Sequence, residues 1–195
     1  MNIVLITGPT EEPVTVSEAK LHLRVDHHDE DDYIKDMIRE VREDVENDTR
    51  RALMTQTWDY YLDAFPKGNA IILPFGNLQS VTHVKYTDSD GVQTAMTVTT
   101  EYLVETNGDQ FGRIVLPYSV SWPSVVLHPS NPIVIRFICG WTSRALVPAR
   151  YKSAIKLLLS KRYVNRGENY VGFNTVFEDP TVNNLLFSQK LWGDF

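Results

Sequence analysis

The chain has 195 residues, of which 43% are hydrophobic, and its formal net charge is −6 with a sequence pI of about 5.3. This length suits one domain, or one domain with an insertion. The acidic balance argues against a basic surface that grips phosphate backbones, so any contact with DNA is expected to be weak or indirect. Cys139 is the single cysteine, which excludes an intrachain disulfide and a thiolate metal cluster within one subunit.

The N-terminus lacks the basic start and the long apolar run of a signal peptide. No stretch of the sequence approaches the roughly 18 apolar residues that a membrane-spanning helix needs. We therefore expect a soluble protein that folds in an intracellular compartment.

Two helices are predicted in the first 50 residues. Thr15 and Glu18 form a capping box that satisfies two backbone amides, so a short helix is expected to begin there and to end near Val25. The acidic run at residues 29–32 precedes apolar residues spaced by one, three and four, which predicts a second helix of about five turns ending near Thr49. Carboxylates suit its first turn because the unpaired amides there carry partial positive charge.

The period changes to two from Thr55, which indicates that the middle of the chain is β structure. Strands are expected around Trp58 to Leu62 and at residues 70–73, 81–86, 93–98, 102–105, 113–116 and 133–138. Turn residues separate them, so hairpins and an antiparallel sheet or small sandwich are predicted. Residues 117–132 are expected to form an extended loop.

A third helix is predicted from Val147 and Pro148, since proline is tolerated in a first turn. Its apolar stripe runs from Tyr151 to Tyr163 and its flanks are basic. Beyond Gly167 the large apolar side chains have no clean period until a possible last turn at residues 182–186. We expect this segment to be an arm that becomes ordered only on binding a partner, and packing on its own domain is the alternative.

Charge is segregated along the chain: residues 1–48 hold 14 acidic and 5 basic side chains, whereas residues 144–166 hold 7 basic and no acidic ones. The two segments are expected to attract each other within a subunit or between neighbouring subunits. Solvated helix faces are the plainer alternative. The candidate inter-subunit or channel charges are Asp31, Asp32, Asp36, Glu40, Lys152, Lys156, Lys161 and Arg162.

The predicted fold class is α+β, with a helical bundle built from both ends of the chain around an inserted β module. The expected parts are an N-terminal helical part at residues 1–54, the antiparallel β module at 55–140, a helix completing the bundle at 141–166, and an extended arm at 167–195.

The sequence contains no recognisable catalytic or cofactor-binding pattern. Neither a P-loop nor a Gly-x-Ser-x-Gly elbow is present. His27 and His28 are adjacent, so their side chains cannot converge on one ion as residues four apart on a helix do, and the carboxylates that follow are explained by the helix start. We expect no catalytic residue, no metal site and no cofactor.

Several segments occur in an order that resembles the head–tail connector, or head completion adaptor, proteins of tailed phages. They are PVTVSEAKLHLRVD at residues 13–26 with the acidic run after it, TRRALMTQTW at 49–58, LQSVT at 78–82, GRI at 112–114, SWP at 121–123, GW at 140–141 and VP at 147–148. The resemblance covers nearly the whole chain from Pro13. One departure is Arg50, where many relatives are expected to have glycine, so the second helix is not expected to end in a left-handed cap.

This resemblance implies a structural protein without catalytic activity. It implies a ring, commonly twelvefold, that lies beneath the portal protein at the head–tail junction of the virion and is assembled in the host cytoplasm. Such a ring extends the DNA channel, helps to retain double-stranded DNA without reading its sequence, and docks tail or stopper proteins. Related adaptors reach the portal with a C-terminal arm, for which the candidate residues are Leu185, Leu186, Phe187, Leu191, Trp192 and Phe195.

The alternative function is a β-sandwich module that binds carbohydrate or another phage protein, with Trp58, Trp122 and Trp141 as exposed platforms. Exposed indoles would favour this alternative and buried ones would favour core packing. A hydrolase with an unrecognised site is a further alternative, but no group of residues in the sequence supports it.

Overall fold

The computed structural model of the protein describes residues 2–165 and 180–192. These residues divide into two compact units. The strand unit comprises residues 2–9 and 55–140, and the helical unit comprises residues 10–54, 141–165 and 180–192. The fold is α+β, as predicted from the sequence, and the chain passes between the units after Pro9, Met54 and Gly140.

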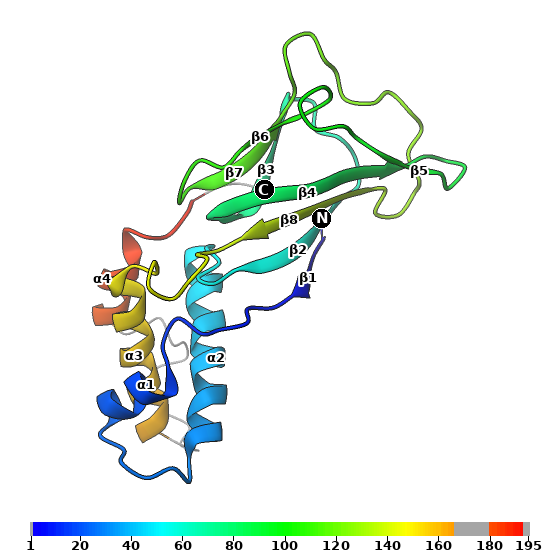
Figure 1. Cartoon of the computed structure of the whole chain (residues 1–195). Coiled ribbons are helices and arrows are strands. Elements are labelled where there is room, and N and C mark those ends of the chain that lie inside the picture. Colours follow the sequence, from blue (N-terminus) through cyan, green and yellow to red (C-terminus); the bar gives the residue numbers. More distant parts are fainter. Residues whose placement is uncertain (1, 166–179, 193–195) are drawn as a thin grey trace. The chain divides into compact units, whose positions relative to one another are not determined.

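The strand unit contains two antiparallel sheets (Figure 1). The five-stranded sheet has the order β1-β2-β8-β4-β5 and the three-stranded sheet has the order β3-β7-β6. The strands are β1 (Asn2–Thr7), β2 (Gln56–Leu62), β3 (Ala70–Gly76), β4 (Leu78–Thr87), β5 (Gln93–Ala95), β6 (Leu103–Glu105), β7 (Phe111–Val115) and β8 (Ile133–Cys139). Each strand that the sequence predicted has a counterpart, and residues 117–132 contribute no strand.

Alternation along β8 places the core of the strand unit. Ile133, Ile135, Phe137 and Cys139 are fully buried, while the residues between them are half-buried. Side chains of β3 and β7, including Ile71, Leu73 and Ile114, are buried as well. Gly112 in β7 lies so close to Leu78 that an added Cβ would be 2.5 Å from the Leu78 Cβ. Glycine is therefore required there by close packing, which no turn or charge pattern could have predicted.

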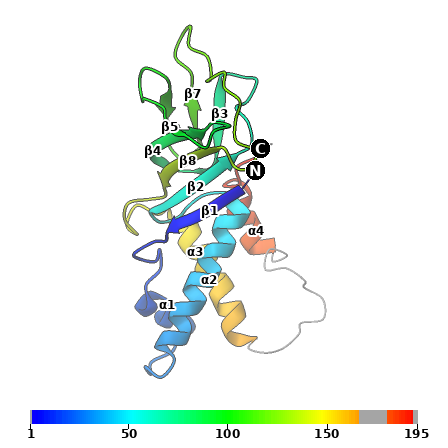
Figure 2. The ribbon, with the colours of Figure 1, turned by 90° about the vertical axis from the view of Figure 1, so that its right-hand side faces the viewer.

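Strand β1 was not predicted. It pairs antiparallel with β2, with Ile3 opposite Tyr60 and Leu5 opposite Trp58, and forms an edge of the five-stranded sheet (Figure 2). Its residues Ile3 to Ile6 are all apolar, so the strand lacks the alternation of apolar and polar residues that identifies a half-buried strand in a sequence. Its partner strand also lies about fifty residues away in the sequence, so no local hairpin signal exists.

A two-point ion pair joins β2 to the central strand β8. Arg136 donates from Nε and Nη2 to the two carboxylate oxygens of Asp59, both at 2.7 Å, and the residues are directly opposite in the register. The Asp59 side chain is almost fully buried. The hydrogen bonds from Arg136 hold the pKa of Asp59 below its ordinary value, although burial opposes this.

Asp59→Asn is expected to lower the free energy of unfolding at neutral pH by about 1–3 kcal/mol, because it removes a charge-assisted pair. Since the folded state lowers the Asp59 pKa, this contribution is complete above the unfolded pKa of about 3.9 and is lost as the pH falls through the lower folded value. Urea denaturation at pH 7 and pH 3 should show a clear gap between the two proteins at pH 7 that narrows at pH 3. A gap of equal size at both pH values would contradict a role for the ionised carboxylate.

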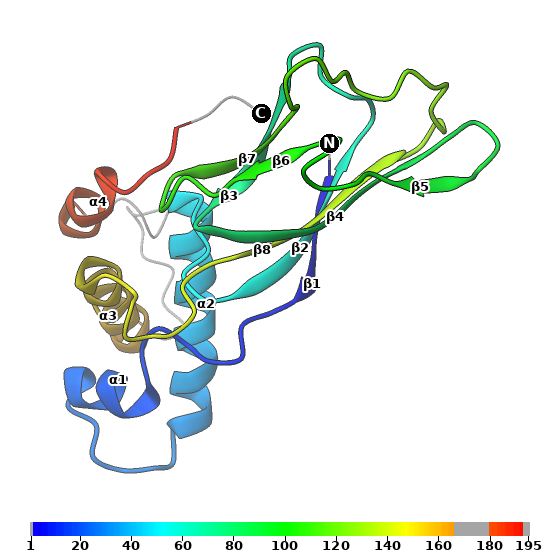
Figure 3. The ribbon, with the colours of Figure 1, turned by 45° about the horizontal axis from the view of Figure 1, so that its top comes forward.

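Four helices form the helical unit: α1 (Val16–Leu23), α2 (Asp31–Thr49), α3 (Ala149–Val164) and α4 (Pro180–Phe187). Within this unit α1, α3 and α4 lie along one side of α2 (Figure 3). The predicted capping box is present, with the Thr15 amide donating to Glu18 at 2.8 Å and the Glu18 amide donating to Thr15 Oγ1 at 3.1 Å. The apolar stripes of α2 and α3 form one buried cluster that includes Ile34, Ile38, Val41, Ile155 and Leu158.

The end of α2 corrects the expectation made for Arg50. The residue adopts a left-handed conformation, with φ 53° and ψ 39°, and its amide donates to the Glu46 carbonyl. This conformation costs a non-glycine residue roughly 1–2 kcal/mol. The turn is held in place because Arg51 also donates to the Glu46 carbonyl, and the Leu53 amide donates to the Glu46 carboxylate at 2.6 Å. Surrounding hydrogen bonds therefore maintain a cap for which the sequence provides no glycine.

Candidate interaction surfaces

The acidic helix α2 and the basic helix α3 contact each other within the helical unit. Arg162 on α3 reaches Glu40 at 3.4 Å and also pairs with Asp44, both on α2. Tyr163, next to Arg162, donates to Glu30 at the start of α2. The predicted attraction between Glu40 and Arg162 is thus present inside one subunit. Whether the remaining predicted charges act between subunits stays a prediction.

The other acidic candidates lie near the start of α2. Asp31 accepts from Lys20 Nζ at 2.6 Å and lies 2.9 Å from His28 Nδ1. These two contacts, with Lys20 contributing most, lower the pKa of Asp31. Asp36 pairs with Arg39 on its own helix at 2.6 Å, and Asp32 is exposed. All three carboxylates lie in the first two turns of α2, where Asp31 is half-buried and Asp32 and Asp36 are exposed.

The basic candidates Lys152, Lys156 and Lys161 are half-exposed on α3. The charges of Lys156 and Lys152 help to lower the pKa of Glu18, behind the larger effect of its hydrogen bond from the Thr15 amide. Arg162 is paired with α2, and the three lysines keep part of their side chains accessible to solvent.

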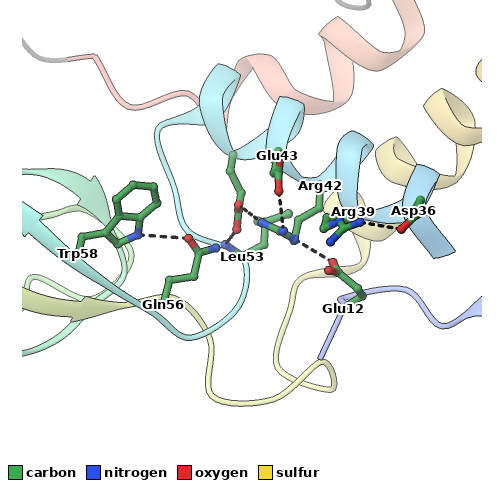
Figure 4. A network of polar contacts seen from close by, with 9 residues as sticks. Glu12, Asp36, Arg39, Arg42, Glu43, Leu53, Gln56 and Trp58 are labelled. Atoms are coloured by element: carbon green, nitrogen blue, oxygen red, sulfur yellow. Dashed lines mark hydrogen bonds and ion pairs between the residues drawn. The ribbon is translucent and has the colours of Figure 1, made fainter. Parts of the chain in front are cut away.

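Arg42, a buried charged residue of the helical unit, was not singled out from the sequence. Its side chain is 4% exposed and lies on α2 among three carboxylates (Figure 4). Nε donates to Glu12 at 2.8 Å, Nη1 donates to Glu46 at 2.5 Å, and Nη2 donates to Glu43 at 3.2 Å. Because Glu46 also accepts from the Leu53 amide, the cluster joins three segments: the chain before α1, α2 itself, and the turn after α2.

Burial and charge act in opposite directions in this cluster. Burial would lower the pKa of the Arg42 guanidinium, but the charges of Glu46 and Glu12 outweigh burial and raise it above its ordinary value. Burial also raises the pKa of Glu12, and Arg42 offsets only part of that increase. The spacing of Arg42 and Glu46, four residues apart on one helix, was the only available sequence signal. That spacing is equally typical of exposed pairs.

The C-terminal segment differs from the extended arm that the sequence predicted. Residues 180–187 form α4, and Val182, Leu186 and Leu191 are buried in the helical unit. Their own apolar spacing explains this, because Val182 and Leu186 are four residues apart and face the same side of a helix. The two candidates Leu186 and Leu191 are thus core residues in this structure, and Leu185 is half-buried. Phe195 lies outside the described residues.

Polar contacts fix the segment after α4. Lys190 Nζ donates to Asp48 at 2.6 Å, the Leu191 amide donates to the Thr49 carbonyl at 3.1 Å, and Arg51 Nε donates to the Gln189 carbonyl at 2.8 Å. All three contacts are made to the end of α2 or to the turn after it. Buried leucines and these hydrogen bonds therefore both anchor residues 186–191 to the helical unit.

Phe187 and Trp192 point away from this anchored segment. Phe187 is 61% exposed and Trp192 is 74% exposed, and their rings meet edge to face with centroids 6.4 Å apart. We name these two residues the aromatic pair. Large exposed aromatic side chains on a fixed backbone are typical of protein-binding surfaces, because they bury much area at little cost in conformational entropy.

The tryptophans of the alternative function are half-buried and pack against other rings. Trp58 lies 4.9 Å from Phe75, Trp122 stacks on Phe65 at 5.2 Å with an interplanar angle of 9°, and Trp141 lies 5.5 Å from Tyr151. Each indole is half-buried and packs on another aromatic ring, which favours core packing over an exposed platform.

Within residues 2–165 and 180–192, no three His, Cys, Asp or Glu side chains are placed to hold a metal ion. Cys139 is fully buried on β8. None of the helices described is both long and apolar enough to cross a membrane.

Comparison with known proteins finds one family match within the N-terminal and central part of the chain. Residues 13–108 match the family described as "Phage gp6-like head-tail connector protein". A comparison with curated protein sequences finds no match.

Solved structures share the fold over the full length. A chain in the structure "Virion of native gene transfer agent (GTA) particle" superposes with a TM-score of 0.79 at 22% identity. Chains in "Neck of empty GTA particle computed with C6 symmetry" and "Neck of native GTA particle computed with C12 symmetry" superpose with a TM-score of 0.78 at 22% and 20% identity. Each match covers 100% of this chain and 98% of the other chain. At this identity the likeness establishes the fold, and the sequence match relates residues 13–108 to the phage gp6-like head–tail connector proteins.

Proposed function

We propose that this protein is a structural adaptor at the head–tail junction of a phage or phage-like particle, and that it has no catalytic role. The observation that carries the proposal is the match of residues 13–108 to the head–tail connector family. The full-length fold shared with a chain in a particle neck computed with C12 symmetry supports a ring of twelve copies beneath the portal protein. Assembly in the bacterial host cytoplasm follows from this role.

In such a ring the protein would extend the DNA channel and help to retain packaged double-stranded DNA, while its other face would dock tail or stopper proteins. The net charge of −6 suits a channel wall that does not hold DNA tightly, because phosphates are repelled by an acidic surface. The exposed acidic side chains Asp32 and Asp36 and the accessible lysines of α3 remain candidates for contacts between subunits or with the channel.

The aromatic pair is the proposed docking surface for the portal protein. The sequence assigned this role to the whole segment from Leu185 to Phe195. We restrict the docking role to Phe187 and Trp192, which are exposed, because Leu186 and Leu191 are buried in the core. The buried leucines would hold the platform, and the exposed rings would enter a pocket on the portal.

The double substitution Phe187→Ala and Trp192→Ala is expected to weaken association with the portal protein of the same particle at least about hundredfold, since exposed aromatic anchors each contribute about 2 kcal/mol or more. Binding is measured by sedimentation of the purified proteins, and circular dichroism should show an unchanged melting temperature. The matched control is Leu21→Ala, which removes a side chain that is 83% exposed on α1 and should leave binding intact. Undiminished binding by the folded double variant would refute the docking surface.

A further inference from the structure

The five-stranded sheet has an unprotected edge at β1. Within residues 2–165 and 180–192, this strand is paired with β2 on one side and with no strand on the other. Val4, Leu5 and Ile6 are 40%, 45% and 43% exposed. The strand NIVLIT contains no charged residue and no proline, which are the features that natural edge strands use to prevent pairing with another chain. An uncharged apolar edge of this kind is typical of a strand that is completed by a partner strand.

The opposite edge of the same sheet is also incomplete. β4 runs over Leu78–Thr87, but β5 pairs with it only at Lys85, Tyr86 and Thr87, at one end of the strand (Figure 1). Residues 78–83 therefore have β8 on one side and no paired strand on the other within the part of the chain that the structure describes. We name residues 78–83 the open segment of β4. It has the sequence LQSVTH, and Ser80 and Thr82 in it are exposed.

We propose that neighbouring copies of this chain join by strand addition, with β1 of one copy pairing with the open segment of β4 in the next. The two edges have equal length, at six residues each. Neither contains Lys, Arg, Asp, Glu or Pro, so no like charges and no missing amide oppose the pairing. The occupant is a second copy because the chain itself carries both halves of the contact.

The position of the two edges determines the symmetry of the contact. They lie on opposite sides of one sheet, so the pairing is head to tail and can repeat around a closed ring. Pairing of β1 with β1 of another copy would instead be two-fold and would end at a dimer. The inference rests on the proposed ring and adds the surface through which its subunits meet.

Disulfide trapping tests this contact directly. Within one copy, β1 and β4 are separated by β2 and β8, which places them about 14 Å apart at the usual strand spacing. A disulfide needs Cα atoms within about 7 Å, so cysteines at Leu5 and at Ser80 or Thr82 can be bridged only between copies. Two positions are used on β4 because its pairing with β8 is irregular along this segment. Cys139 is buried and remains in place.

Leu5→Cys with Ser80→Cys, or with Thr82→Cys, is mixed with the portal protein of the same particle and mildly oxidised. At least one pair is expected to give a ladder of covalent multimers on a non-reducing gel, and mass spectrometry of the bridged peptides should join β1 to the open segment of β4. The matched control, Leu5→Cys with Asp90→Cys in the exposed turn before β5, should stay at the single-copy position. Leu5→Glu, which adds a charge at an exposed position, should reduce ring formation about tenfold or more without unfolding the protein.

The outcomes separate this inference from the proposed function. Rings seen by electron microscopy for the unsubstituted protein, without a disulfide for either pair, would overturn strand addition and leave the adaptor role intact. Failure of the unsubstituted protein to form any ring with the portal would overturn the proposed function itself. A bridge from β1 to the portal protein would also overturn the inference, because the occupant of the edge would then be the portal.

Discussion

Replacing Arg42 with methionine is expected to lower the free energy of unfolding of the helical unit by about 3–5 kcal/mol, because Glu12 and the buried Glu46 lose the guanidinium that pairs with them. Methionine fills much of the same volume, so the loss arises from charge. Glu46 would remain 8% exposed with a carboxylate that Arg42 no longer neutralises, and Glu12 would lose its 2.8 Å hydrogen bond. Chemical denaturation followed by far-ultraviolet circular dichroism measures the change.

Arg39→Met is the matched control for this substitution. Arg39 lies on the same helix and also pairs with a carboxylate, Asp36, but the two side chains are 58% and 63% exposed. Exposed pairs contribute about 0–1 kcal/mol, so little change is expected. Equal destabilisation by both substitutions would mean that burial of the Arg42 cluster is not what makes it important. A second test removes the partner charges: Arg42→Met combined with Glu46→Gln should recover part of the loss, since fewer buried charges remain unpaired.

Leu186→Ala is expected to destabilise the protein by about 2–5 kcal/mol through the cavity that it leaves in the helical core. Leu186 is fully buried on α4, in the same cluster as Val45 and Leu158. The result would establish that the C-terminal segment is part of the folded subunit before any partner binds. Thermal unfolding and the urea midpoint are the measurements.

Phe187→Ala provides the control at the neighbouring position. Because Phe187 is 61% exposed, its removal should change the free energy of unfolding by less than about 1 kcal/mol. If Leu186→Ala were as mild as Phe187→Ala, α4 would not be docked in the free protein, and the arm that the sequence predicted would be the better description. The pair of substitutions therefore distinguishes an anchored platform from an arm that becomes ordered on binding.

Local sequence patterns were sufficient to predict those helices and strands whose formation depends mainly on their own residues. The Thr15 and Glu18 capping box defines the start of α1, the apolar spacing from Ile34 to Val45 defines α2, and the alternation from Ile133 to Cys139 defines β8. In each case the physical cause lies within a few residues, as a cap, a 3.6-residue period or a two-residue period. The order of such segments was also enough to indicate the head–tail connector family.

Features that depend on distant neighbours were inaccessible to that reasoning. Val4 and Leu5 become a strand because β2 accepts them at its edge, and Gly112 is required because Leu78 packs against it. Arg42 is buried where it pairs with Glu12, which lies thirty residues earlier in the chain.

The sequence by itself determined the class of fold, helices α1, α2 and α3 and most strands, and it indicated the head–tail connector family, because periodicity, caps and segment order can be read from the residues themselves. Only the tertiary structure decided which apolar residues of the C-terminal segment are buried and which are exposed. Leu186 and Phe187 are adjacent and similar in hydrophobicity, yet helical geometry turns one into the core and the other toward solvent. The tertiary structure also revealed the two incomplete sheet edges, since an edge exists only after the other strands have paired.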